Sequence, residues 1–249
     1  MARSFDCVDF KLAEADFFLE HLKTCTNPLW GVNFYFSAFV SAARSVTFAL
    51  QAVMDGQPGF AEWYAKKQDE MRADPICRFF VGYRNEVLKT GELPITGGYG
   101  GFVGAAKNNG TKLELKYRFG RSILTGEQLP AVDRTEFIQR AIVGGQGEKR
   151  EEEPDAIACC CEYMRKMVAL VRSCYADFGS VIDPDEYYTI DNLRKINRSI
   201  EELEAELGFP RGWTSVGDHT DEERLRALCA HVPRSSIKHL FDKYAITPS

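Results

Sequence analysis

The sequence predicts a mainly α-helical protein, an up-and-down helical bundle with an inserted β-hairpin and additional C-terminal helices. Three observations predict this class. Apolar residues recur at helical spacing through the first 90 residues, a glycine-rich stretch then leads into strand-like alternation, and a long helical stripe resumes after residue 154. We therefore divide the chain into residues 1–92, 93–153 and 154–249, the last beginning with a helix that we expect to complete the bundle.

Residues 1–92 are predicted to form four helices. Apolar periodicity and breaker residues predict the first three over 11–25, 29–54 and 60–72. Asp74 then caps a fourth helix, which has Pro75 at its first position, where a missing backbone N–H costs nothing. This fourth helix is predicted to run to Lys89.

The helix over 29–54 is apolar and long enough to cross a bilayer, which takes about 20 residues. Asn33, Arg44 and Gln51 interrupt it, and a charged arginine near the centre of a span costs several kcal/mol. We therefore interpret it as a buried bundle helix whose arginine reaches a partner group, and expect no membrane association.

Residues 93–153 are predicted to leave the helical pattern. Lys112 to Phe119 alternate between apolar and charged residues, as in a strand with one buried face. Asn108-Asn109-Gly110 accept positive φ, so residues 102–107 are predicted to pair back on this strand as a hairpin. Residues 144–153 are polar and glycine-rich, and are predicted to be a linker.

Residues 154–249 return to helical periodicity. Asp155 is predicted to cap a helix whose apolar stripe continues to Phe178, which requires a large apolar surface such as the N-terminal helices. A further helical region is predicted from Asp183, a short helix with a capping box from Thr220, and a last helix from Ser236.

Composition narrows the functional classes. The net charge of −5 argues against a protein that binds nucleic acid over its whole surface, but it allows a local basic site. The chain has eight cysteines, of which Cys159-Cys160-Cys161 are adjacent, and no two of them form a Cys-x-x-Cys motif. The N-terminus has no apolar signal region. We therefore expect reduced thiols and a cytoplasmic protein.

No cofactor or metal is expected. The run Gly98-x-Gly100-x-x-x-Gly104 approximates a dinucleotide loop, but it leads into a predicted hairpin rather than from a strand into a helix. Adjacent cysteines on a helix point about 100° apart and cannot all reach one ion. The histidines lie on separate predicted elements without ligand spacing: His21, His219, His231 and His239.

The fourth helix carries the most chemically suggestive residues. On a helical wheel its core stripe comprises Ile76, Phe79, Phe80, Tyr83 and Val87. Arg84 falls at the margin of this stripe, and Asn85 and Lys89 are neighbours on the opposite side. A structural interpretation stays open, in which Arg84 anchors adjacent helices and Lys89 compensates the helix dipole.

The segment Asp74 to Gly91, preceded by Ser41-Ala-Ala-Arg44 and Phe60-Ala-Glu-Trp-Tyr64, resembles the HEPN superfamily of helical bundle proteins. Members carry an arginine late in a bundle helix, usually a polar residue next, and a histidine a few positions on. Arg84 and Asn85 match this pattern, and Lys89 stands where the histidine is expected. The resemblance extends over residues 11–91 at most, with the helix after Asp155.

The resemblance implies a homodimer in which two copies of this helix face one cleft, where active members cut RNA without a metal. Arg84 suits the cation beside the scissile phosphate. Lys89 suits proton transfer poorly, because an ordinary lysine, with a pKa near 10.4, is protonated at neutral pH. Burial or a second Arg84 could lower that pKa, and Lys89 could otherwise hold a phosphate.

Three functional hypotheses follow. The first is a catalytically lapsed HEPN-like homodimer that binds RNA, nucleotide phosphate or a protein partner. The second is an active metal-independent endoribonuclease of a toxin or defence system, with Arg84, Asn85 and Lys89 as its catalytic residues. The third is a purely structural or regulatory dimer.

Overall fold

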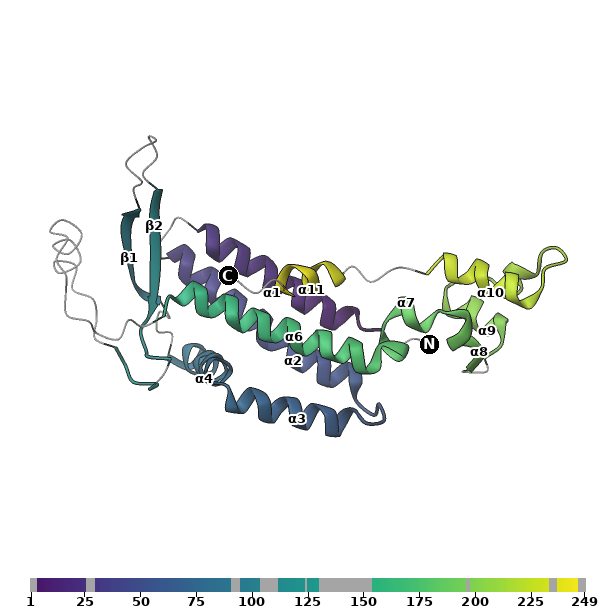
Figure 1. Ribbon diagram of the computed structural model, residues 1–249, viewed down its shortest axis with the longest axis horizontal. Coiled ribbons are helices and arrows are strands. Elements are labelled where there is room, and N and C mark those ends of the chain that lie inside the picture. The colour runs from purple at the N-terminus through teal and green to yellow at the C-terminus, as the bar shows by residue number, and fades with distance from the viewer. Residues whose placement is uncertain are drawn as a thin grey trace. The chain divides into compact units, whose positions relative to one another are not determined.

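The computed structural model describes residues 4–25, 30–90, 95–103, 112–123, 125–129, 154–195, 198–232 and 237–245. For residues 86–90, 96–103 and 112–116 it describes the backbone alone. The described residues are mainly helical, as the sequence predicts (Figure 1).

The chain divides into two compact units. One, called here the bundle unit, comprises residues 11–48 and 54–167, and the other, called the C-terminal unit, comprises residues 1–10, 49–53 and 168–249. Three long helices contribute residues to both units: α1 (Asp6–Thr24), α2 (Trp30–Met54) and α6 (Ala156–Ile182). Helices α3 (Phe60–Ala73) and α4 (Pro75–Thr90) belong to the bundle unit.

The helix predicted over 11–25 is α1, which begins five residues earlier, at Asp6. The reason is that Phe5 and Val8 are buried. Val8 extends the buried stripe of Leu12, Ala15 and Leu19 by one further turn toward the N-terminus.

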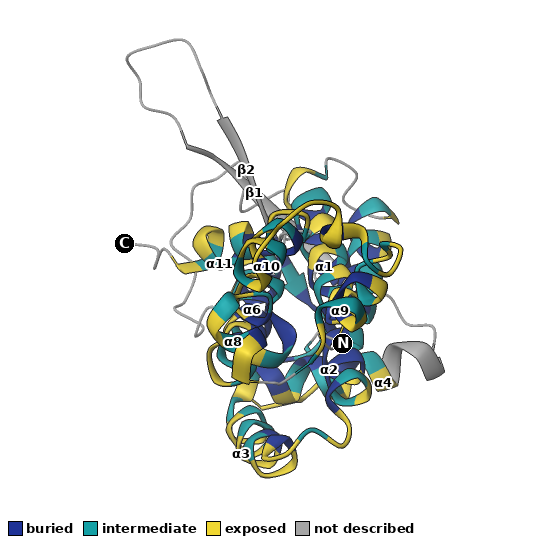
Figure 2. Ribbon diagram, turned by 90° about the vertical axis from the view of Figure 1, so that its right-hand side faces the viewer, coloured by how far each residue is buried: buried dark blue, intermediate teal, exposed yellow. Residues whose placement is uncertain are grey.

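An aromatic cluster forms the core of the bundle unit. Phe80 of α4 stacks on Tyr163 of α6 with ring centroids 4.4 Å apart, and Phe39 of α2 meets Tyr163 edge to face at 6.3 Å. Phe36 of α2 also packs against Phe80. These rings are buried, and Figure 2 shows the buried sides of α2 and α6 in dark blue. Helices α2, α4 and α6 therefore share one core.

Asp74 caps α4, as predicted. Its Oδ1 accepts a hydrogen bond from the Cys77 backbone N–H at 2.9 Å, and its Oδ2 pairs with Lys166 of α6 at 2.7 Å. Partial burial alone raises the pKa of the Asp74 carboxyl, but these two partners lower it further than burial raises it. The cap thus joins α4 to α6 as well as starting α4.

Two antiparallel strands follow α4: β1 (Ile95–Val103) and β2 (Lys112–Phe119), with Val103 opposite Lys112. Strand β2 has the predicted bounds. The first strand begins at Ile95, whereas residues 102–107 were predicted, and residues 104–111 between the strands lie outside the described residues. The predicted linker over 144–153 lies outside them too.

Side chains from distant helices hold one end of the strand pair. The buried Asn33 of α2 accepts the backbone N–H of Ile95 at 2.8 Å and donates to the Ile95 carbonyl at 3.1 Å. Asp155 accepts the backbone N–H groups of Tyr117, in β2, and of Ala158, in the first turn of α6. Asp155 is therefore the predicted cap of α6 and an anchor for β2.

The C-terminal unit continues with short helices. The helical region predicted from Asp183 is interrupted and forms α7 (Pro184–Tyr187), α8 (Ile190–Lys195) and α9 (Ile200–Glu206). The 3₁₀ helix η1 (Trp213–Ser215) precedes α10 (Asp221–Ala230), and α11 (Lys238–Ala245) ends the described chain. Thr220 and Glu223 form the predicted capping box of α10. Ser236, the predicted start of the last helix, lies outside the described residues.

Among the described residues, α2 alone is long and apolar enough to cross a membrane by length and composition. Half of its most apolar window is buried inside the protein. The core helix of a soluble protein and a signal sequence near the N-terminus both have these properties.

Candidate nucleic-acid interface

Arg84 lies in the last part of α4 for which side chains are described. Cys77, Phe80 and Tyr83 are buried, while Arg84 is half-buried beside them. This agrees with the predicted position of Arg84 at the margin of the core stripe. Cys77 was not assigned to the stripe, but it is buried in the first turn of α4, next to Ile76, which was.

Arg84 meets two residues of α2. The guanidinium carbons of Arg44 and Arg84 lie over the ring of Phe48, at 4.6 Å and 6.0 Å from its centroid. The Phe48 side chain is 48% exposed. Two cations from different helices therefore share one exposed aromatic ring, an attractive arrangement because the ring face carries negative charge density.

The hydrogen-bonding groups of the two arginines are incompletely used. Arg44 donates to the hydroxyl of Thr47 at 3.0 Å. The Nε of Arg84 is buried and has no hydrogen-bond partner in the part of the chain that the structure describes. Among the described residues neither guanidinium is paired with a carboxylate, whereas some exposed arginines, such as Arg72, are. The pair of guanidiniums is therefore suited to an anion from outside the chain.

The other two predicted site residues are not brought together with Arg84. Asn85 is exposed, as the wheel predicted, and makes none of the contacts around Phe48. The side chain of Lys89 lies outside the described residues. The roles predicted for Asn85 and Lys89 stay predictions.

The sequence reasoning missed Phe48. A signal was present, because Phe48 follows Arg44 by four residues and so lies one turn along the same face of α2. Its exposure could not be read from the sequence, since an apolar residue in an apolar helix is assigned to the core.

The cysteines and histidines show no comparable arrangement. Burial raises the pKa of Cys77 to about 12 and places that of the fully buried Cys160 well above its ordinary value. Such thiols are inert at neutral pH. Within the described ranges, no group of three or more histidine, cysteine or acidic side chains is placed to hold a metal ion.

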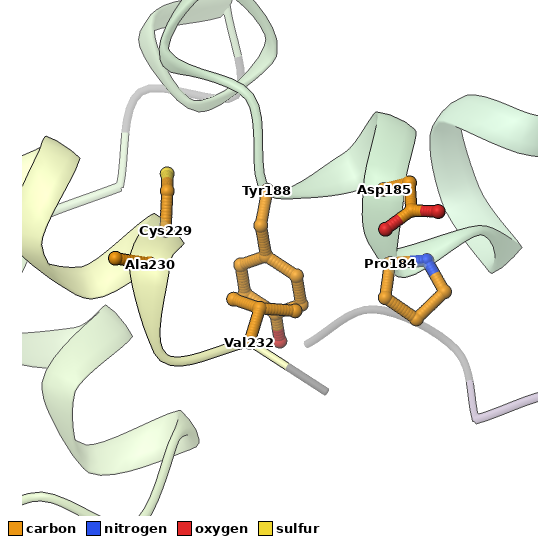
Figure 3. A pocket seen from close by; sticks show the side chains of 6 residues that line it. All are labelled: Pro184, Asp185, Tyr188, Cys229, Ala230 and Val232. Carbon is orange, nitrogen blue, oxygen red and sulfur yellow. The ribbon is translucent and has the colours of Figure 1, made fainter. Parts of the chain in front are cut away.

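The C-terminal unit contains a pocket of about 340 Å³ between α7 and α10. It is lined by Pro184, Asp185, Tyr188, Cys229, Ala230 and Val232 (Figure 3). Its polar groups already have partners in the protein: Asp185 pairs with Lys238 at 2.6 Å, and the Tyr188 hydroxyl donates to Glu206 at 2.5 Å. The pocket therefore offers less to an anion than the site around Phe48.

A family model described as Bacteriophage lambda protein ea47 matches residues 30–98 of the chain. This segment runs from the start of α2 into β1, less than half of the chain, and it includes Arg44, Phe48 and Arg84. Neither a curated protein nor a solved structure matches the chain.

Proposed function

We propose that this chain is an RNA-binding, HEPN-like homodimer whose catalytic pattern has lapsed, and that Arg44 and Arg84 hold a backbone phosphate of single-stranded RNA. One observation supports this above the others. Two guanidiniums converge on an exposed ring, and among the described residues no carboxylate neutralises either of them.

The chemistry of the three side chains suits a nucleotide. A guanidinium that stacks on a ring through its face keeps the N–H groups at its edge for hydrogen bonds, and phosphate accepts such bonds in pairs. The exposed part of Phe48 offers a surface on which a base can stack, and such stacking does not depend on base identity. The proposed ligand is therefore an unpaired strand rather than a duplex.

The resemblance to HEPN proteins supports the finer part of the proposal, an up-and-down bundle, and the proposed β-hairpin inserted into it rests on the alternation of residues 112–119 instead. Arg84 and Asn85 occupy the matching motif positions, and Lys89 replaces the histidine that would move the proton. Binding without cleavage follows from that replacement. An active endoribonuclease that uses Arg84, Asn85 and Lys89 is the alternative, and a structural dimer is the third hypothesis.

The test is the binding of a fluorescently labelled single-stranded RNA by fluorescence anisotropy in excess chelator. We expect Arg84→Ala and Arg44→Ala each to weaken binding about tenfold, since a hydrogen bond to a charged group contributes about 1.5–3 kcal/mol. Arg72→Ala is the matched control, because Arg72 is exposed on α3 and pairs with Asp69 at 2.9 Å. It should leave binding unchanged.

The same samples also separate the hypotheses. Equal binding by the wild type and Arg84→Ala would contradict the proposed site. If the wild type cleaves RNA and Arg84→Ala does not, the active-endoribonuclease hypothesis replaces the lapsed one. If the wild type neither binds nor cleaves RNA, the structural dimer is favoured.

A further inference from the structure

The site around Phe48 carries two positive charges. The guanidinium carbons of Arg44 and Arg84 lie 4.6 Å and 6.0 Å from the centroid of its ring. Arg44 is the one charged residue of α2, so this helix supplies no carboxylate to balance them. Two cations beside one ring are neutralised by a ligand with two negative charges, whereas an internal phosphate of a strand carries one.

The protein fixes the two guanidiniums from its own side and leaves other N–H groups to a ligand. Arg44 donates from Nη1 to the hydroxyl of Thr47 at 3.0 Å, and Thr47 is buried. The Nε of Arg84 is buried, so its two terminal nitrogens, with four N–H groups, are the ones that a ligand can reach. Each guanidinium can then donate to a pair of phosphate oxygens.

The chemistry of phosphate separates two kinds of ligand. An internal phosphate of RNA is a diester, with one negative charge and two oxygens outside the ester bonds. A terminal phosphate is a monoester, which has a charge of about −1.5 to −2 at pH 7 and three strong acceptor oxygens. The monoester therefore matches two guanidiniums better than the diester does, both in charge and in the number of acceptors.

The burial of the two arginines favours the same ligand. Arg44 and Arg84 are half-buried, and the Phe48 ring beside them is 48% exposed. An internal phosphate has a nucleoside on each side, and both have to be placed around half-buried cations. A terminal phosphate has one nucleoside, which can extend over the exposed part of Phe48 and stack its base there.

We propose that this site binds the phosphorylated end of an RNA strand, with Arg44 and Arg84 holding the terminal phosphate monoester and Phe48 stacking on the adjoining base. The inference rests on the proposed function and narrows its ligand from any backbone phosphate of a single strand to a strand end. A 5′ end and a 3′ end share this chemistry, so the experiment includes both.

The test is competition against a labelled single-stranded RNA, followed by fluorescence anisotropy with the full chain at about pH 7.5, where the monoester is almost fully ionised. The competitors are unlabelled oligonucleotides of one sequence that carry a 5′-phosphate, a 3′-phosphate or hydroxyls at both ends. We expect a phosphorylated strand to bind about tenfold more tightly than the hydroxyl strand, as one further charge-assisted hydrogen bond would give. Inorganic phosphate should compete far less well, because it has no base to stack on Phe48.

Lowering the pH gives a second readout. The second pKa of a phosphate monoester is about 6, so the advantage of the phosphorylated strand should shrink from about tenfold at pH 7.5 to about twofold at pH 5.

The neighbouring groups of the protein do not imitate this change. Arginine side chains do not lose their proton in this range. Asp74 and Lys166, which join α4 to α6 at 2.7 Å, both stay ionised. Burial raises the pKa of the Tyr163 phenol of α6, and although the charge of Arg44 opposes that rise, Tyr163 stays neutral. The hydroxyl strand, titrated over the same pH range, is the control for any other group of the protein.

Two variants place the effect at this site. Arg84→Ala removes one of the two cations, so phosphorylated and hydroxyl strands should then bind with nearly equal affinity. Arg72→Ala removes an exposed arginine of α3 that pairs with Asp69, so it should keep the tenfold ratio.

The outcomes separate this inference from the function on which it rests. If the wild type binds phosphorylated and hydroxyl strands equally and Arg84→Ala weakens both, the terminal phosphate is wrong and the RNA site stands. If no strand binds, both are wrong. A ratio that Arg84→Ala leaves unchanged would overturn the assignment of the terminal phosphate to this site. Inorganic phosphate that competes as well as the phosphorylated strand would contradict the stacking of a base on Phe48.

Discussion

Glu204 is a carboxylate with no exposed surface, and it holds the loop that contains η1. It accepts the backbone N–H and the hydroxyl of Thr214 at 2.7 Å and 2.5 Å, and also the backbone N–H of Gly212. Burial raises the pKa of this carboxyl, but the hydrogen bonds from Thr214 and Gly212 lower it further, so it lies below its ordinary value.

We expect Glu204→Gln to lower the free energy of unfolding by roughly 2–3 kcal/mol at neutral pH, since the amide N–H₂ would face backbone donors. A lowered folded-state pKa stabilises the fold fully above the unfolded pKa of about 4.3, and this contribution is lost as the pH falls through the folded value. Thermal unfolding of both proteins across that pH range is the measurement. A stability difference that does not shrink in acid would contradict the assignment.

At the site itself, the sequence predicts on which side of its own helix a residue lies, but not which residue of another helix it contacts. The wheel of α4 placed Arg84 at the core margin and Asn85 on the exposed side, and the structure confirms both positions. The meeting of Arg84 with Phe48 depends on how α4 packs against α2. Helical periodicity describes each helix alone, so it contains no information about that contact.

The first residue of strand β1 is hydrogen-bonded to the side-chain amide of Asn33. Asn33→Leu keeps the branching of the side chain but replaces its polar groups with methyl groups, which leaves the N–H and C=O of the buried Ile95 without their partner. Each buried unpaired group costs about 1–3 kcal/mol, so we expect the free energy of unfolding to fall by about 2 kcal/mol or more. Denaturant titration measures it. Ser37→Ala, at a half-buried position of the same helix, should stay within about 0.5 kcal/mol of wild type.

Elements determined by local sequence were predicted well. The start of α4 follows from Asp74 and Pro75, and β2 follows from its alternation, because both signals act over a few residues. Strand β1 was placed too late in the sequence, because its start is fixed by Asn33, which is 62 residues away. Periodicity alone cannot reveal a partner at that distance.

The charge of the whole chain bears on RNA binding. The net charge is −5, so two arginines must act against a repulsive background. For single strands the logarithm of the affinity falls with the logarithm of salt concentration by about 0.7 for each phosphate contact. With one phosphate held at each site we expect a slope near −0.7 for the wild type and a shallower slope for Arg84→Ala. Anisotropy titrations at several salt concentrations measure both, and a much steeper slope would point to a larger basic surface.

The hydrogen bonds between Asn33 and Ile95 also constrain the order in which the bundle unit assembles. They join residues 62 positions apart, and bringing the ends of so long a loop together costs conformational entropy. That cost is small once the packing of the helices has already placed the two ends near each other. Helices α3 and α4 form within that loop from local contacts, on a faster timescale. We therefore expect the amide of Asn33 to close a structure that is already largely built, so that Asn33→Leu speeds unfolding and changes the folding rate little.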